Sequence, residues 1–151
     1  MNRREKSLKI NESYHKAINI LEKTGIRITS QRKILTKLIF QKGNRHLSAE
    51  ELFHEVKDMK VNISLATIYN TLRNLSNYGL LREIVVDQNK SIYCTNHMPH
   101  YHLYIEDEEK IIDIPNQKID LSNIPEIPAC LSLHDIDIIV RIRTLKDKKI
   151  N

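Results

Sequence analysis

The residues best suited to chemistry are two histidines separated by a single residue, His100 and His102. On an extended segment, residues i and i+2 point to the same side of the chain, so the two imidazoles would lie together. Cys94 lies shortly before them, and Asp113 lies on what is predicted to be the paired strand. A thiolate, two imidazoles and a carboxylate would suit Zn²⁺ or Fe²⁺. The structural alternative is that Cys94 is a small buried apolar side chain and Asp113 caps a turn.

A second candidate site is the helix predicted over Ser64–Tyr78. Ser64 is a good N-cap, and Gly79 is a natural C-terminal stop. One apolar stripe recurs at helical spacing: Leu65, Ile68, Leu72 and Leu75. The opposite face is polar and lacks acidic residues: Thr67, Tyr69, Asn70, Arg73, Asn74 and Asn77. Asn and Arg can pair with base edges, and Thr and Tyr can contact a thymine methyl. The alternative is an ordinary solvated helix.

The segments before this helix predict a helix-turn-helix. Ser48 and Glu51 form a capping box, and residues 60–63 form a short turn that leads directly to Ser64. The helix between them is expected to bury four apolar side chains: Leu52, Phe53, Val56 and Met59. Two helices, a tight turn and a polar-faced second helix are typical of this motif.

The flanking segments complete a winged helix. Two earlier helices are predicted, one over residues 14–21 and one capped by Thr29 or Ser30, after a loose basic arm at Met1–Lys9. Beyond Gly79, residues 81–86 and 91–95 predict a β-hairpin. In a winged helix the recognition helix enters the major groove and the hairpin lies along the DNA backbone. We therefore expect a winged-helix DNA-binding domain over residues 1–96, with a basic N-terminal arm.

Charge is distributed unevenly along the 151 residues, whose net charge is +5. Residues 1–95 hold 17 basic and 9 acidic side chains, so +8, whereas residues 96–151 hold 7 and 10, so −3. This asymmetry predicts an anionic polymer as partner of the first segment. The chain has no apolar run of about 18 residues and no signal-peptide core, so a cytoplasmic protein is expected.

The second half predicts a small sheet. Residues 102–106 and 110–114 are predicted as strands joined by an acidic turn, and residues 136–142 alternate as a third strand. Prolines disfavour a long helix over residues 115–130. Because three strands are too few for independent stability, a two-fold partner is expected to complete the sheet. Residues 97–151 would then form a small α/β dimerisation and effector-sensing domain, which gives an α+β fold overall.

Four stretches together resemble the ferric uptake regulator family along nearly the whole chain. They are GIRITSQR, HLSAEELF, SLATIYNTLRNLSNYGLL and the H-x-H segment. The closer resemblance is to the heme-responsive iron response regulator branch, which has similar RHL-S-AEEL wording and an abbreviated C-terminal half. The resemblance implies a dimeric winged-helix repressor or activator whose affinity for operator DNA is set by iron, another metal or heme.

The resemblance also implies roles for individual residues. His46 falls on a metal ligand contributed by the DNA-binding half, and His100 and His102 fall on two hinge-side ligands. Asp113 falls on a carboxylate ligand of the dimerisation half. Cys94 falls on a position that is usually Asp or Glu, which gives a softer and oxidisable ligand. The implied cofactor is a single regulatory Fe²⁺, Mn²⁺ or Zn²⁺, with heme as the other effector.

On the DNA side, Tyr69 and Asn70 fall on base-contacting positions, and Arg27 falls on a basic residue that reaches the minor groove. The family's four-cysteine zinc site and a Cys-Pro heme motif are both absent from this sequence. If heme binds, its axial ligands are therefore expected from His100 and His102.

The leading hypothesis is an iron- or heme-responsive DNA-binding transcription regulator of iron and heme homeostasis genes. The alternative is a constitutive DNA-binding protein whose histidines only pack or face solvent. A zinc hydrolase or deaminase would need an acid/base carboxylate beside the metal. Because the H-x-E pairing of the deaminases is missing, no enzyme activity is expected.

Overall fold

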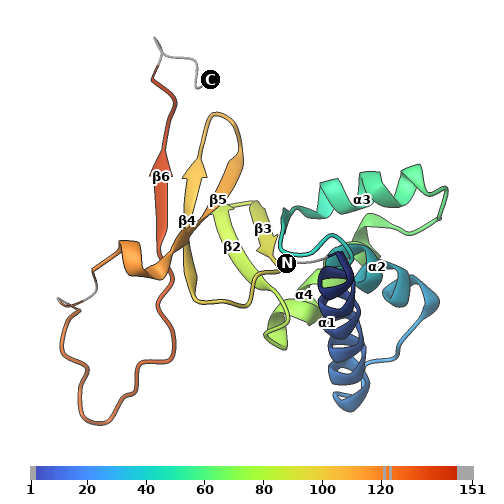
Figure 1. The fold of residues 1–151 in the computed structure, drawn as a ribbon, viewed down its shortest axis with the longest axis horizontal. Coiled ribbons are helices and arrows are strands. Elements are labelled where there is room, and N and C mark those ends of the chain that lie inside the picture. Colours follow the sequence, from blue (N-terminus) through green and yellow to red (C-terminus); the bar gives the residue numbers. More distant parts are fainter. Residues whose placement is uncertain (1–2, 121, 123, 146–151) are drawn as a thin grey trace. The chain divides into compact units, whose positions relative to one another are not determined.

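The described residues form four α-helices and two small three-stranded sheets (Figure 1). The computed structural model describes residues 3–120, 122 and 124–145. The chain divides into two units, Met1–His97 and Met98–Asn151, which we call the first and second units. The predicted α+β fold is confirmed. None of the described helices is long and apolar enough to span a membrane.

The first unit is a winged helix preceded by an additional helix. Its elements are α1 (Arg3–Lys23), α2 (Ser30–Phe40), β1 (His46–Leu47), α3 (Ala49–Asp58), α4 (Leu65–Asn77), β2 (Arg82–Asp87) and β3 (Lys90–Cys94). The strands form an antiparallel sheet in the order β1-β3-β2. Helices α2 to α4, followed by the β2–β3 hairpin, therefore give the arrangement that the sequence predicted.

Side-chain caps fix where the helices begin, because the first amides of a helix have no partner within it. Thr29 caps α2 by accepting a hydrogen bond from the Arg32 amide at 3.2 Å, which settles the choice between Thr29 and Ser30. Ser48 and Glu51 form the predicted capping box of α3, with reciprocal hydrogen bonds of 3.1 and 2.7 Å. Ser64 likewise caps α4.

The C-terminus of α4 needs a residue that tolerates the left-handed backbone. Gly79 has φ +67° there, a conformation that other residues adopt at a cost. The Leu80 amide donates to the Leu75 carbonyl at 2.8 Å and the Gly79 amide donates to the Ser76 carbonyl at 2.9 Å. These two hydrogen bonds are a Schellman motif, which ends the helix cleanly.

The core of the first unit includes the stripe predicted on α4. Ile68, Leu72 and Leu75 are fully buried, with Leu65 partly buried at the edge. Their neighbours in the core include Leu35 and Ile39 of α2 and Leu52 and Val56 of α3. Met59 was expected in this core, but 52% of it is exposed because it lies one residue beyond the end of α3. A rigid core thus supports α4 while its polar face remains outside.

Two features of the first unit differ from the sequence-based expectation. The basic segment Met1–Lys9 was expected to be a loose arm, but α1 already begins at Arg3; Met1 and Asn2 lie outside the described residues. The strand His46–Leu47 was not predicted. A two-residue strand carries no periodic signal, and this one exists because it pairs with β3.

The second unit is built on β4 (His100–Ile105), β5 (Lys110–Pro115) and β6 (Ile139–Ile142), with a short 3₁₀ helix, η1 (Asn116–Lys118). The central strand is β4, with β5 antiparallel on one side and β6 parallel on the other. The third strand is thus shorter than the predicted 136–142. Backbone hydrogen bonds hold it, from the His102 amide to the Ile138 carbonyl at 3.1 Å and from the Glu106 amide to the Ile142 carbonyl at 2.9 Å.

The pleat gives this sheet two faces of different character. His102 pairs with Asp113, so both side chains point to one face together with that of His100. On the other face, Leu103 pairs with Ile112 on one side and with Val140 on the other. The sheet therefore has one face that carries the ligand-type side chains and another that is mainly apolar.

Candidate metal centre and nucleic-acid interface

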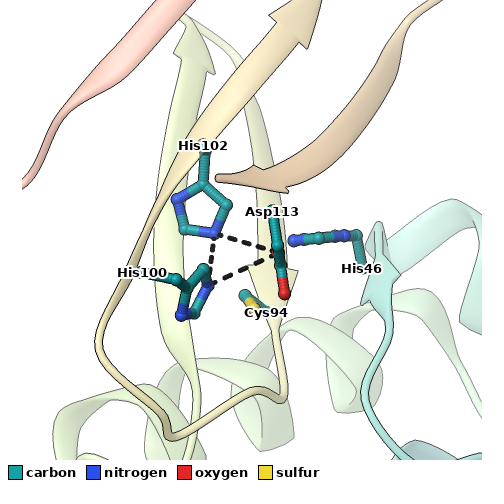
Figure 2. A group of neighbouring side chains, drawn as sticks. All are labelled: His46, Cys94, His100, His102 and Asp113. Carbon is teal, nitrogen blue, oxygen red and sulfur yellow. Dashed lines mark hydrogen bonds and ion pairs between the residues drawn. The ribbon is translucent and has the colours of Figure 1, made fainter. Parts of the chain in front are cut away.

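Three side chains of ligand type converge on one face of the second unit's sheet. The Nε2 atoms of His100 and His102 lie 2.9 Å apart. The Asp113 Oδ1 atom lies 3.5 Å from His100 Nε2 and 3.9 Å from His102 Nε2 (Figure 2). Both histidines are buried, and the Asp113 side chain is 32% exposed. The predicted pairing of the H-x-H segment with Asp113 is thereby present in the register of β4 and β5.

A backbone contact orients one of these imidazoles. His100 Nδ1 lies 2.6 Å from the carbonyl oxygen of Met98, which can only accept a hydrogen bond. The Nδ1 atom is therefore the donor, and Nε2 of the neutral ring is left as the atom that faces His102. Such a hydrogen bond on the far nitrogen is the usual way in which a protein fixes the tautomer and direction of a metal-ligating histidine.

The distances within the cluster fit a metal ion. Ligand atoms about 2.0–2.2 Å from an ion are separated by roughly 3.0 Å in octahedral and 3.4 Å in tetrahedral geometry. The three observed separations of 2.9, 3.5 and 3.9 Å bracket those values. Small side-chain adjustments would therefore bring the two imidazoles and the carboxylate around one ion. A purely structural histidine pair does not require this third group.

The first unit carries two further side chains of ligand type on neighbouring strands. His46 on β1 lies directly opposite Cys94 on β3, and directly paired residues share one face of an antiparallel sheet. Cys94 is buried, which agrees equally with the alternative that it is a small apolar side chain of the core. Both residues are labelled in Figure 2, as are His100, His102 and Asp113, the other three candidate ligands.

The position of His46 is fixed by its neighbour Arg45. The Arg45 amide donates to Thr95 Oγ1 at 2.8 Å, and the Thr95 amide donates to the Arg45 carbonyl at 3.0 Å. The Arg45 guanidinium makes two hydrogen bonds to the Glu55 carboxylate, at 2.7 and 3.2 Å. Burial alone would raise the pKa of Glu55, but hydrogen bonds from Arg45 and Lys42 outweigh it, so the pKa is lowered. An ionised Glu55 on α3 thus holds β1 in place.

The candidate DNA interface is the outer face of α4. Tyr69, Asn70 and Arg73 are exposed there, while Thr67 is partly buried and its hydroxyl lies 2.9 Å from that of Ser64. Arg27 is exposed in the loop between α1 and α2, where its carbonyl accepts a hydrogen bond from the Arg32 side chain. The helix presents the predicted base-reading side chains without an acidic residue of its own.

Glu50 also lies at the polar face of α4, although the sequence did not indicate it. The Tyr69 hydroxyl donates a hydrogen bond of 2.5 Å to Glu50 Oε1, which brings a carboxylate from α3 against the polar face of α4. This hydrogen bond lowers the pKa of Glu50 and raises that of Tyr69. In the sequence, Glu50 lies within the capping segment of α3 and can be recognised only as an acidic residue of that helix's first turn. No local pattern predicts its contact with a side chain 19 positions away.

A winged helix combined with strand-borne metal-ligand side chains defines a class of protein, the metal-responsive transcription regulators. Residues 23–139 match the ferric uptake regulator family. The chain is 32% identical to the peroxide-responsive repressor PerR of Staphylococcus epidermidis over 111 residues, 74% of this chain and 73% of that protein. PerR of Staphylococcus aureus is 33% identical over 104 residues, 69% of this chain and 70% of that one. The chain belongs to the ferric uptake regulator family.

Solved structures agree with this assignment at the level of the fold. The ferric uptake regulator of Helicobacter pylori superposes with a TM-score of 0.67 at 17% identity, covering 93% of this chain and 96% of that one. That of Vibrio cholerae gives 0.65 at 22% identity, covering 82% and 96%. The family resemblance predicted from the sequence is confirmed by the family match and the curated relatives, and with it the class of transcription regulators. The resemblance to the heme-responsive branch stays a prediction.

Proposed function

We propose that the protein is a homodimeric, metal-responsive repressor that binds operator DNA through α4. In this proposal one Fe²⁺, Mn²⁺ or Zn²⁺ held by His46, Cys94, His100, His102 and Asp113 sets the affinity for DNA. The regulated genes would be those of iron and heme homeostasis. The observation that carries the proposal is the convergence of His100, His102 and Asp113 within 3.9 Å on one sheet face.

Solved relatives support an ion as the effector. Two of them are a ferric uptake regulator of Pseudomonas aeruginosa with manganese and one of Francisella tularensis with iron. A third is a zinc-bound manganese uptake regulator. The candidate ligands of this chain do not favour these three metal ions equally. The Cys94 thiolate is a soft ligand, which favours Zn²⁺ or Fe²⁺ over the harder Mn²⁺.

We further propose that the two ligand groups serve a single ion. His46 and Cys94 belong to the first unit, whereas His100, His102 and Asp113 belong to the second. Only five residues, 95–99, separate Cys94 from His100, so the chain itself keeps the two groups near each other. An ion shared between the units restricts their relative orientation. Free energy gained on binding the ion is thereby coupled to one arrangement of the DNA-binding units.

Heme, implied by the closer branch resemblance, is the second candidate effector, but the H-x-H geometry favours a bare ion. The two axial ligands of a heme iron approach from opposite faces, with ligand atoms about 4 Å apart across the iron. The Nε2 atoms of His100 and His102 are 2.9 Å apart and come from one side of one strand. One heme could therefore use one of these histidines without rearrangement, but not both.

The coupling to DNA would operate through dimer geometry. In a dimer, two recognition helices must match half-sites roughly 34–36 Å apart, one helical turn of DNA or a multiple of it. A second copy covering the apolar face of the β4–β5–β6 sheet would hold the two chains together. Metal bound between the units would then set the separation of the two α4 helices, and DNA would bind the matching arrangement more tightly.

The test combines metal analysis with DNA selection. Purified protein would be analysed for bound metal, then used to select duplexes from a random pool in the presence of Zn²⁺, Fe²⁺ or Mn²⁺ and in chelator. The expected result is close to one ion per chain and a two-fold symmetric consensus whose affinity depends on metal. Sequence-specific binding with equal affinity in chelator would instead identify a constitutive DNA-binding protein. Enrichment of no sequence under any condition would contradict the proposed function altogether.

A further inference from the structure

The hydrogen bond between Tyr69 and Glu50 joins the outer face of α4 to the start of α3. Its 2.5 Å length places the phenol oxygen directly against the carboxylate oxygen Oε1. Glu50 lies in the first turn of α3, whose position is fixed by the Ser48–Glu51 capping box. Tyr69 is 39% exposed, so its ring lies at the surface with one end held by Glu50. The contact fixes the direction of a side chain that would otherwise sample several rotamers.

We propose that Glu50 is a positioning and specificity-determining residue for DNA recognition, which acts by holding the Tyr69 ring in the orientation that reads bases. The inference rests on the proposed function, because it requires α4 to be the recognition helix. It adds a residue outside that helix to the recognition surface.

The hydroxyl of Tyr69 is engaged by Glu50. Because the hydroxyl donates to Glu50, it is not available to donate to a phosphate oxygen. Phosphate contacts carry no sequence information, whereas apolar contact of a ring with a thymine methyl does. The hydrogen bond therefore directs Tyr69 towards base reading and away from sequence-independent contacts. A ring held in place before binding also loses less entropy when it meets DNA.

The negative charge of Glu50 also bears on DNA specificity. Glu50 is an ionised carboxylate beside a helix face that has no acidic residue of its own. Phosphates that approach this face at random are repelled by it, and the repulsion acts on every DNA sequence alike. The favourable ring contact forms only with the right base step. A repulsive element combined with a specific attractive one raises the ratio of specific to non-specific affinity.

A purely structural role for Glu50 makes a different prediction. An acidic residue in the first turn of a helix stabilises it through the helix dipole, independently of Tyr69. Neutralising Glu50 would then lower thermal stability slightly and leave sequence discrimination unchanged. The ratio of two DNA affinities separates these roles, because a general loss of stability affects both affinities alike.

The experiment is a double-mutant cycle with Glu50→Gln, Tyr69→Phe and the combined variant. The probes are a duplex selected by the wild-type protein from a random pool, and a shuffled duplex of the same composition. The measured quantity is the ratio of the two dissociation constants in full-length protein under the selecting metal condition. Glu22→Gln removes one negative charge from an exposed position on α1 and is the control for net charge. Melting temperatures verify that every variant is folded.

We expect Glu50→Gln and Tyr69→Phe each to lower the ratio by roughly three- to tenfold, the worth of one hydrogen bond. The combined variant should lower it by less than the product of the two single effects, because both changes act on the same contact: Tyr69→Phe removes the donor, and Glu50→Gln replaces the charged acceptor by a weaker neutral one. Glu50→Gln should also tighten binding to the shuffled duplex, whereas Glu22→Gln should leave the ratio unchanged. A ratio unaffected by Glu50→Gln, or effects that multiply in the combined variant, would overturn the inference. If the wild type selects no sequence, the proposed function fails and the inference falls with it.

Discussion

The two units differ in how much of their apolar surface they bury for themselves. In the first unit the stripes of four helices meet in one core, in which residues such as Leu35, Ile68 and Leu72 have no exposed surface. In the second unit Ile112 remains 40% exposed, and Val140 and Ile142 each remain 37% exposed. The first unit therefore buries its apolar stripes within itself, whereas the second leaves part of one sheet face uncovered. We propose that a partner chain covers that face.

The largest effect is expected where a partner chain would cover the sheet. Val140→Asp would place an unpaired carboxylate in the proposed dimer interface, at a cost of about 3–5 kcal/mol of association free energy. Sedimentation should show a folded monomer or aggregate in place of the dimer, with the helical circular dichroism of the first unit unchanged. Lys118→Asp, at an exposed position of η1 outside the sheet, is a control for adding a carboxylate to the same unit. A variant that stays dimeric like the wild type would place the dimer contact elsewhere.

A core truncation in the first unit should show the opposite behaviour. Leu72→Ala removes a fully buried side chain and should lower the free energy of unfolding by about 2–5 kcal/mol. Urea titration followed by helical circular dichroism measures this loss at any protein concentration. The matched change Ile142→Ala in the second unit should affect helix unfolding by less than about 1 kcal/mol. Equal losses in the two variants would mean that the units do not differ in the way proposed.

We expect that the proposed metal site can be removed without disturbing the first unit. His100→Ala combined with His102→Ala should weaken metal binding by at least about 100-fold, because both imidazoles of the converging cluster are lost. Calorimetric titration with Zn²⁺ measures the change, and His134→Ala, an exposed histidine of the same unit, is the control. The double variant should still bind DNA, without a response to metal. A response like that of the wild type would place the sensor elsewhere.

Smaller effects are expected at the DNA interface. Asn70→Ala should cost about 1–3 kcal/mol with the selected duplex and little with a shuffled one, because it removes a base contact. Arg27→Ala should weaken binding to both duplexes. It should also reduce the slope of the salt dependence by up to about the contribution of one phosphate contact. Fluorescence anisotropy at several salt concentrations distinguishes the two patterns. If the footprints of both variants were identical to that of the wild type, neither the outer face of α4 nor Arg27 would contact DNA.

The sequence was a good guide wherever structure depends on neighbours along the chain. Ser48 with Glu51 and Ser64 predicted helix starts to the residue, because a cap acts within one turn. The spacing from Leu65 to Leu75 predicted the buried stripe of α4 for the same reason. The H-x-H pair predicted two imidazoles on one face, since alternation along a strand is also local.

Features that depend on distant partners were missed. The strand His46–Leu47 exists only through its pairing with β3, whose partner residues lie 48 and 46 positions further along the chain. Strand β6 pairs in parallel with β4 across a long connection. The alternating residues 136–142 indicated a strand but not its partner or its direction. Val140 of this strand is 37% exposed within a single chain, where the proposed partner would cover it. Glu50 was missed for the same reason, because its contact with Tyr69 is tertiary.

The most direct test of the central claim measures DNA affinity of a His46→Ala variant with and without metal. His46 belongs to the first unit, so in a shared site its loss must reduce the metal response even though His100, His102 and Asp113 are intact. We predict that this variant still binds Zn²⁺, although more weakly than the wild type does. Saturating metal should no longer change its affinity for the selected duplex. A His46→Ala variant in which metal changes DNA affinity by the same factor as in the wild type would contradict a site shared between the two units.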